Sequence, residues 1–267
     1  MHDDPESNKD HKKKKGLKLS RKSTSKIIGK WRKLSSDETG VLSMTESFEV
    51  DDSDIVKKVL GLPLAESVAL DPSLDRVPLP SFFRHAIDFV EENGLYTEGI
   101  YRLSPPKSRL DELERRANCG EEMVFADPHE AAGLIKRFLR QIPDASRIPP
   151  EFDAIAESCT CGLATTTILT PRLVCSCGAA RTMRECLNNL GPATKTLFVY
   201  VFLHAQHVMA QEKDNKMGLQ ALGLLLQTVL DRSRMLVCFS AHAIRPCDGV
   251  PVAGACYLVD EDTRIIK

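Results

Sequence analysis

The feature that most constrains this chain is an apolar run near residue 200. Residues 194–212 read TKTLFVYVFLHAQHVMAQE and are apolar on nearly every side of a 3.6-residue period. Because a helix that is apolar all round must be covered by others, this run predicts a central, buried helix. Apolar residues spaced three and four apart predict further helices over 78–94, 108–120, 127–143 and 216–230. The chain shows no convincing alternating strand pattern and no internal repeat, so we predict an all-α body.

Two of the predicted helices carry start signals. In DPHEAAGLIKRFLRQIP, Asp127 is the expected N-cap, Pro128 takes the first helical position and Glu130 completes an acidic variant of the capping box. The other helix, SRLDELERRANCG, is expected to begin with Ser108 as its N-cap.

Two basic residues lie beside the apolar stripe of the helix over 127–143. Lys136 and Arg140 are four residues apart, so they share one helix face. We expect both side chains on an exposed strip, where positive charge would attract an acidic partner surface.

Composition divides the chain into three segments. Residues 1–50 are polar, with few periodic apolar positions, and predict a disordered arm. Residues 51–240 hold the helical patterns, and the tail at 241–267 cannot be assigned. Residues 1–33 contain 12 Lys or Arg against 4 Asp or Glu, a net charge of +8 in a chain whose total is −1. A basic arm therefore precedes an acidic body.

The arm has three interpretations: a solvated tail, a segment for nuclear import or nucleic-acid contact, and a segment that binds anionic lipid headgroups. Ile27, Ile28 and Trp31 can share one helical face among the lysines, which favours the membrane surface, and we expect no nucleic acid. The lipid-binding side chains would be Lys12, Lys13, Lys14, Lys15, Lys26, Lys30, Arg32 and Lys33. The N-terminus lacks the apolar core of a secretory signal, no run is long enough to span a membrane, and nine cysteines suit reduced thiols. We expect a cytoplasmic protein, peripheral at the membrane.

Arg102 stands in EGIYRLSPPKSRLDEL, between the predicted helices over 78–94 and 108–120. Gly99 permits backbone angles that other residues avoid, and Pro105 disfavours a helical conformation at the residue before it. Arg102 is therefore expected on an ordered loop. A guanidinium offers five donors in a planar fork and suits charge stabilisation on a phosphate. The alternative is an arginine that braces two helices through their carbonyl ends.

The loop sequence GLYTEGIYRLS resembles the arginine-finger loop of RhoGAP domains, which activate Rho-class small GTPases. AAGLIKRFLRQIP, VFLHAQHV and NKMGLQALGLLLQTVL resemble later helices of that family and occur in family order. The resemblance implies an all-α RhoGAP-like domain over 51–240, with Arg102 supplied in trans to a Rho- or Rac-class GTPase. It also implies that Lys136 and Arg140 meet the GTPase and steady the finger loop. Such an activator is not a stand-alone enzyme and needs no cofactor of its own, because its partner holds the GTP and magnesium.

The chain departs from the family pattern at several positions. Pro105 follows the finger's serine where the family has glycine, and Ala221 stands where a later helix carries an asparagine that reaches the GTPase. Three functions stay open: a GTPase activator, a catalytically weak or inactive scaffold that binds small GTPases, and an all-α adaptor unrelated to GTPases. The flanking sequence is similar to the Ral-interacting branch of the family. Nothing shows the heptads of a Ral-binding coiled coil, so Ral binding is not expected.

The segment CTCGLATTTILTPRLVCSCGAA, residues 159–180, has no counterpart in the family pattern. Its cysteines form two C-x-C pairs that are 13 residues apart, and four thiolates make a full tetrahedral zinc set. C-x-C is tighter than the usual zinc knuckle, and no histidine supports it. We therefore favour a disordered loop, or non-coding sequence translated in error, over a zinc site.

The central helix carries His204 and His207, three residues apart. Such a pair can bind a metal, but the apolar surroundings favour histidines that are hydrogen-bonded in the core or at an interface. The sequence therefore predicts no metal site.

Overall fold

The computed structural model describes residues 58–143, 147–170, 173–246 and 256–258. The chain separates into two units, residues 1–51 and 52–267. The basic arm, with its expected disorder and membrane contacts, lies outside the described residues. No helix in the described ranges is long and apolar enough to cross a membrane.

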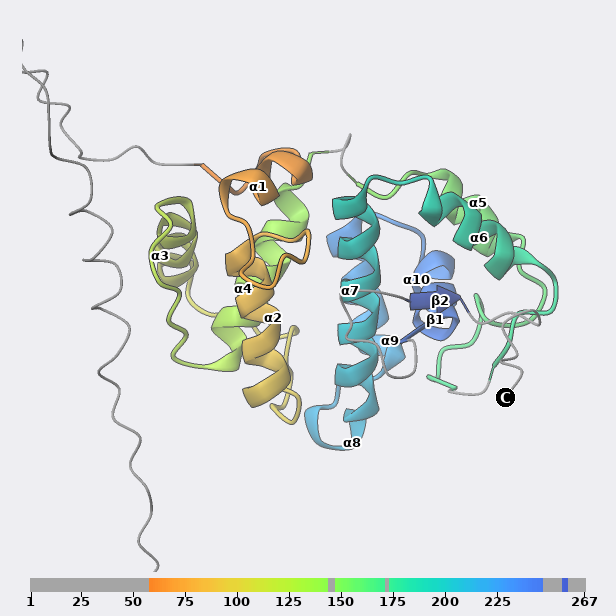
Figure 1. The fold of residues 1–267 in the computed structure, drawn as a ribbon. Coiled ribbons are helices and arrows are strands. Elements are labelled where there is room, and N and C mark those ends of the chain that lie inside the picture. Colours follow the sequence, from red (N-terminus) through yellow and green to blue (C-terminus); the bar gives the residue numbers. More distant parts are fainter. Residues whose placement is uncertain (1–57, 144–146, 171–172, 247–255, 259–267) are drawn as a thin grey trace, which may run out of the picture. The chain divides into compact units, whose positions relative to one another are not determined.

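The described part of the chain is built from helices (Figure 1), as predicted. The helices are α1 (Leu64–Leu70), α2 (Ser81–Asn93), α3 (Lys107–Asn118), α4 (Pro128–Gln141), α5 (Glu151–Glu157), α6 (Ala179–Asn188), α7 (Pro192–Ala210), α8 (Glu212–Asn215), α9 (Leu219–Leu230) and α10 (Arg234–Ala243). Two three-residue strands, β1 (Ile244–Pro246) and β2 (Cys256–Leu258), pair antiparallel with Ile244 opposite Leu258. This small hairpin falls in the tail that the sequence left unassigned.

The apolar helix α7 occupies the centre of the fold, as predicted. Figure 1 shows it between the layer that contains α2 and α4 and the group formed by α5, α6 and α10. It contacts α1, α2, α9, α10 and β1. Phe198 and Phe202 are buried, and the Phe198 ring meets that of Phe152 on α5 edge-on at 6.0 Å between centroids. Residues 197–206 are all buried, which explains why the middle of this helix shows no polar face.

One predicted helix start is confirmed and the other is wrong. The Asp127 side chain accepts a hydrogen bond from the Glu130 backbone N–H at 3.1 Å, which confirms the N-cap. The Glu130 carboxylate accepts from the Ala126 N–H at 2.8 Å and not from the Asp127 N–H, as the predicted capping box would require. The helix α3 has no side-chain cap and begins one residue before Ser108, because the prolines ahead of it fix the backbone. Pro106, at φ −53° and ψ 142°, is its N-cap residue, so Ser108 lies inside the first turn.

Candidate functional site

The loop between α2 and α3, residues 94–106, presents Arg102 at the surface. Gly99 and Tyr101 have φ values of 68° and 67°, in the left-handed region. Ile100 and Tyr101 are buried, whereas the Arg102 side chain is exposed. A left-handed tyrosine costs about 1–3 kcal/mol and persists only where its surroundings hold it firmly. The loop is therefore anchored through the buried side chains of Ile100 and Tyr101.

Lys136 on α4 lies under this loop, not on an exposed strip as predicted. Only 6% of the residue is exposed. Its Nζ donates to the Tyr101 carbonyl, to the Ser104 Oγ at 3.0 Å and to the Leu103 carbonyl at 3.3 Å. Burial, together with the positive charge of Arg140, lowers the pKa of Lys136 to about 8. The ammonium thus holds the carbonyl groups on both sides of Arg102, which agrees with the loop-steadying role that the resemblance implied.

The hydroxyl of Tyr101 ends a buried chain of polar groups. Burial raises the pKa of Glu91, but hydrogen bonds with His204 and His207 outweigh this effect and lower that pKa to about 2. His204 Nδ1 is hydrogen-bonded to the Glu91 carboxylate, and His204 Nε2 is hydrogen-bonded to the Tyr101 hydroxyl at 2.5 Å. His207, half exposed, pairs with the other Glu91 oxygen at 2.9 Å. The prediction that His204 is a hydrogen-bonded core histidine is confirmed.

Asn215, at the end of α8, is a support that the sequence reasoning missed. The residue is fully buried, and its Nδ2 donates to the carbonyls of Leu95 and Val208, both at 2.7 Å. Its backbone carbonyl accepts from the Gly99 N–H at 2.8 Å, and its Oδ1 accepts from the Met217 N–H at 2.7 Å. The available signal was the Asn-Lys-Met block, whose asparagine ties the finger loop to the start of α9.

Two glycines let the loop and its neighbours approach closely. A Cβ on Gly99 would lie 3.2 Å from the Arg102 guanidinium and 3.1 Å from the Leu103 side chain. On α4, a Cβ on Gly133 would lie 3.0 Å from the Pro105 ring. Pro105 therefore packs onto α4. Residue 105 is not among the positive-φ residues of the described ranges, so proline fits this loop where the family has glycine.

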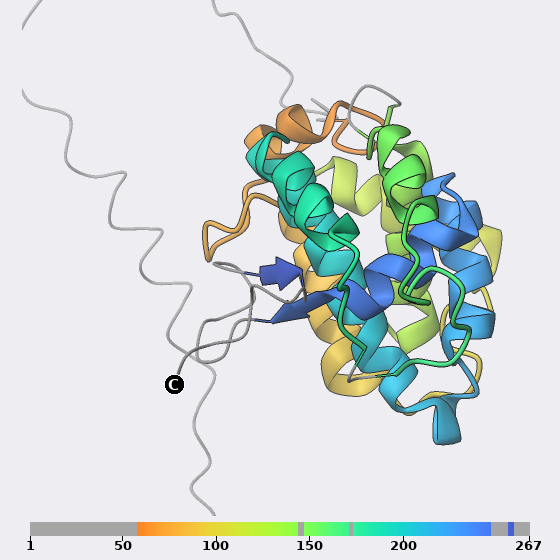
Figure 2. The same ribbon diagram turned by 90° about the vertical axis from the view of Figure 1, so that its right-hand side faces the viewer.

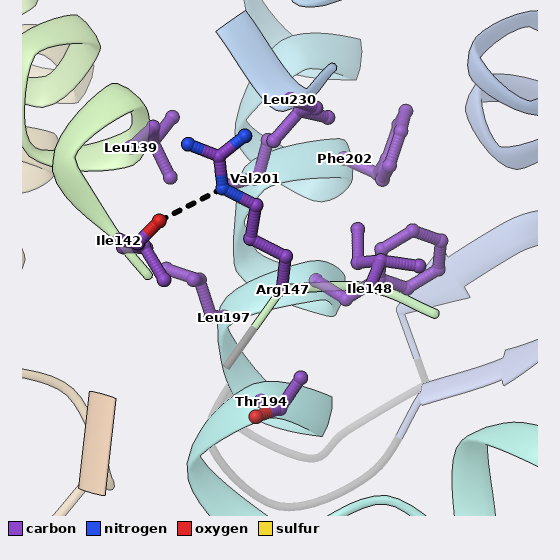
Figure 3. Close-up of a pocket in the computed structure, with 10 residues that line it drawn as sticks. Leu139, Ile142, Arg147, Ile148, Thr194, Leu197, Val201, Phe202 and Leu230 are labelled. Atoms are coloured by element: carbon purple, nitrogen blue, oxygen red, sulfur yellow. Dashed lines mark hydrogen bonds between the residues drawn. The ribbon is translucent and has the colours of Figure 1, made fainter. Parts of the chain in front are cut away.

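Arg140, the second predicted contact residue, is exposed near the end of α4. Its backbone carbonyl accepts from Arg147 Nη2 at 2.9 Å. Arg147 Nε also donates to the Ile142 carbonyl at 2.8 Å, the dashed line in Figure 3. Figure 3 shows the aliphatic part of Arg147 among the apolar side chains of a pocket between α4, α7 and α9. Arg147 thus closes the C-terminal end of α4 and fixes the backbone that carries Arg140.

The structure brings two of the three predicted site residues together at this loop. Lys136 donates hydrogen bonds to the carbonyls of the residues before and after Arg102. An adaptor unrelated to GTPases would not require Lys136 and Arg102 to lie together. The Arg102 guanidinium makes no hydrogen bond or ion pair with another described residue. It is a cation carried outward on a loop whose backbone is held from below.

Comparisons with known proteins identify the family of this chain. The model of the RhoGAP domain family matches residues 80–234, more than half of the chain, and the chain belongs to this family. RalA-binding protein 1-A of Xenopus laevis is 31% identical over 216 residues, covering 78% of this chain and 30% of that protein. RalA-binding protein 1 of Drosophila melanogaster is 28% identical over 210 residues, covering 73% and 31%. The chain thus spans about a third of the length of these relatives.

A solved structure shares the fold. The crystal structure of human Rho GTPase activating protein 15 aligns with a TM-score of 0.53 at 18% sequence identity. The alignment covers 75% of this chain and 94% of that one. At this identity the likeness supports the all-α RhoGAP fold alone.

Proposed function

We propose that this protein accelerates GTP hydrolysis on a small GTPase of the Rho or Rac class by inserting Arg102 into the GTPase's nucleotide site. The observation that carries the proposal is an exposed, unpaired Arg102 between two carbonyls that the buried Lys136 holds. Hydrolysis develops negative charge on the transferring phosphoryl oxygens, and a guanidinium supplied in trans stabilises that charge. The GTP and the magnesium ion belong to the partner.

The buried supports matter because the finger has to arrive already shaped. A loop that ordered itself only on binding would lose conformational freedom at that moment, and its affinity would fall. Here Lys136, Asn215 and Tyr101 fix the backbone beforehand, and only the Arg102 side chain has to extend. Arg140, exposed on the same helix as Lys136, is the proposed contact to the GTPase surface.

A second candidate function is a scaffold that binds small GTPases without accelerating hydrolysis much. Ala221 on α9 favours it, because this half-buried side chain has no hydrogen-bonding group at a position where the family resemblance implies an asparagine. The activator is favoured over it because Pro105 does not displace the finger loop from its supports.

Single-turnover GTP hydrolysis on a panel of Rho- and Rac-class GTPases tests both functions. Wild type should accelerate hydrolysis on at least one of them. Arg102→Ala should remove most of an acceleration on the order of 10³–10⁵, yet leave binding within a few fold, because a finger acts mainly in the transition state. Arg76→Ala, at another arginine in the described part of the chain, is the control and should behave as wild type.

The outcomes separate the candidates. Tight binding without acceleration by wild type would establish the scaffold. Equal losses of binding and rate in Arg102→Ala would make Arg102 a docking residue. A chain that neither binds nor activates any member of the panel would reject both functions.

We also propose that the basic arm holds the protein at anionic membranes, where lipid-anchored partners would be concentrated. The support is the charge of +8 over residues 1–33, with apolar residues interleaved. Full-length protein should sediment with anionic vesicles at low salt and lose this binding as salt rises. A chain that begins at Asp52 should not sediment with the vesicles. Equal sedimentation of both chains, or preference of the arm for DNA, would refute this role.

A further inference from the structure

The segment between α5 and α6 gathers four cysteine sulfurs at one point. Cys159 follows Ser158, the C-cap of α5, and Cys177 precedes Gly178, the N-cap of α6. The Sγ atoms of Cys159, Cys161, Cys175 and Cys177 all lie within 4.8 Å of one another. Figure 2 shows this connection on the face of the molecule where α5, α6 and α10 lie. The expectation of a disordered loop is wrong for its described residues.

We propose that these four cysteines bind one zinc ion as a closed, structural tetrathiolate site. Zinc bound to four thiolates at about 2.3 Å places neighbouring sulfurs about 3.8 Å apart. Sulfur separations of 3.5 Å for Cys175–Cys177 and 3.7 Å for Cys159–Cys177 agree with that spacing. The ion would need little rearrangement of the four side chains.

The backbone around the cluster already points hydrogen-bond donors at its sulfurs. The N–H groups of Ser176 and Cys177 both reach the Cys161 Sγ at 3.2 Å. The N–H of Ala180 reaches the Cys175 Sγ at 3.3 Å. Such donors disperse the negative charge of thiolates bound to a metal and orient them. Gly178, at φ 86°, provides the turn that lets α6 begin directly after the second C-x-C pair.

Disulfide bonds explain the cluster less well. A disulfide joins sulfurs at about 2.05 Å and uses them in separate pairs, with no reason to bring two pairs to one point. A metal ion uses all four sulfurs at once. Soft thiolate ligands in a tetrahedral set select zinc or iron–sulfur chemistry over magnesium and calcium.

The ion's role would be to fasten α5 to α6. Apart from its cysteines, the connection is tied to the body by apolar side chains and by His242 of α10, whose Nε2 lies 3.1 Å from the Ile168 carbonyl. The apolar side chains are those of Leu163, Ala164, Leu169 and Leu173. A zinc ion would add a bond between the two ends of the segment. Since the protein fills all four coordination positions, no site would remain for a substrate or for catalysis.

Metal analysis of the full-length protein, purified with zinc present and then dialysed, tests the stoichiometry. We expect one zinc ion per chain in wild type and most of it lost in Cys161→Ser and in Cys177→Ser. The matched controls are Cys119→Ser and Cys186→Ser, at half-buried cysteines outside the cluster, which should keep their zinc. Equal losses in the controls, or no stoichiometric zinc in wild type, would overturn the proposal.

A cobalt titration of the zinc-depleted full-length protein avoids reliance on variants that fail to fold. We expect one equivalent of Co²⁺ to give the strong visible absorption of a tetrahedral thiolate site, and zinc to abolish it. Native alkylation should then find four cysteines protected when zinc is present and reactive after its removal. Absence of the cobalt spectrum, iron in place of zinc, or disulfides among these cysteines by mass spectrometry would each refute the assignment.

Discussion

Two long connections between described helices, residues 94–106 and residues 159–170 with 173–177, are held in opposite ways. The first is fixed by polar side chains from distant elements: Lys136 on α4, Asn215 on α8 and His204 on α7. The second gathers its own cysteines at a single point. The first loop is tied to the body at many points and keeps one arginine free, whereas the second also brings its own two ends together through its cysteine sulfurs. A connection can therefore be rigid through the packing of the whole fold or through a local crosslink.

The difference predicts which changes spread through the molecule. A support of the first loop belongs to the core, so its removal should weaken both the fold and the presentation of Arg102. A ligand of the second loop belongs to the α5–α6 connection, so its removal should act locally. The following substitutions and treatments test this contrast.

The largest expected effect on stability comes from Asn215→Ala. The change leaves two carbonyls and one N–H, of Leu95, Val208 and Met217, without their partner in the core. We expect the free energy of unfolding to fall by about 2–4 kcal/mol, because unsatisfied buried groups are costly. Urea denaturation measures it. Asn188→Ala removes an exposed hydrogen bond to Lys195 and should cost less than about 0.5 kcal/mol; equal costs would contradict the anchoring role.

Lys136→Met should reduce activation of the GTPase by about 10–100-fold, or about 1.4–2.8 kcal/mol. The carbonyls of Tyr101 and Leu103 lose their common donor, so the backbone on both sides of Arg102 loosens. Single-turnover hydrolysis measures the loss. The control is Arg137→Met, at the adjacent position on α4, where ion pairs to Asp111 and Glu114 face α3. If Arg137→Met lost as much activation, the loss would come from a general disturbance of α4 and not from the missing lysine.

The sequence was sufficient to predict those elements that have a strong periodic pattern of apolar residues or clear glycine and proline signals. The helices α2, α4 and α7 and the loop that exposes Arg102 were all predictable from apolar spacing, glycine and proline. The burial of Lys136 was not, because an amphipathic pattern places every lysine on the polar face. Only the loop folding over α4 covers it. Asn215 was missed for the same reason: its partners are up to 120 residues away in sequence.

Short helices and the cysteine cluster were beyond sequence reasoning for other reasons. The seven-residue α5 and ten-residue α6 flank the segment without a family counterpart and are too short for a clear period. The helix α10 did carry a signal, because Ser233 caps it by accepting from the Leu236 N–H at 3.1 Å. The meeting of two C-x-C pairs depends on how α5 and α6 approach one another, which their spacing in the chain does not specify.

A smaller effect is expected from pH, through Lys136. Its pKa of about 8 means that the ammonium loses its proton between pH 7 and 9, which weakens its bonds to the loop carbonyls. Activation should fall by less than about tenfold over this range, since the charged fraction falls by about that factor. The intrinsic rate of the GTPase, measured at each pH, is the reference. Lys136→Met should lack this fall, and an equal fall in the variant would assign it to another group.

The same titration affects the stability of the fold in the opposite direction. The pKa of Lys136 is lowered from an ordinary value of 10.5, so between pH 8 and 10.5 the unfolded chain holds a proton that the folded chain has released. The unfolded state then binds more protons, and this group's contribution to the free energy of unfolding rises with pH. As pH rises from 7 to 9, wild type should therefore lose activation of the GTPase, while deprotonation of Lys136 should not lower its free energy of unfolding. Urea midpoints at pH 7 and 9, compared with those of Lys136→Met, separate the two effects.

The smallest expected effect is that of zinc removal on activation. If the α5–α6 connection is held locally, chelation should speed amide hydrogen exchange within 160–177 and leave residues 95–106 as protected as before. Activation should change by less than about twofold, because distant sites without shared partners act independently to within a few tenths of a kcal/mol. Figure 1 shows the central helix α7 between α2 and α4 on one side and α5 and α6 on the other, so coupling between the two connections would have to pass through intervening helices. Chelator-treated Cys161→Ser is the reference for effects of the chelator that do not involve zinc. Faster exchange in 95–106, or a tenfold loss of activation beyond that of the reference, would show that the two connections are not independent.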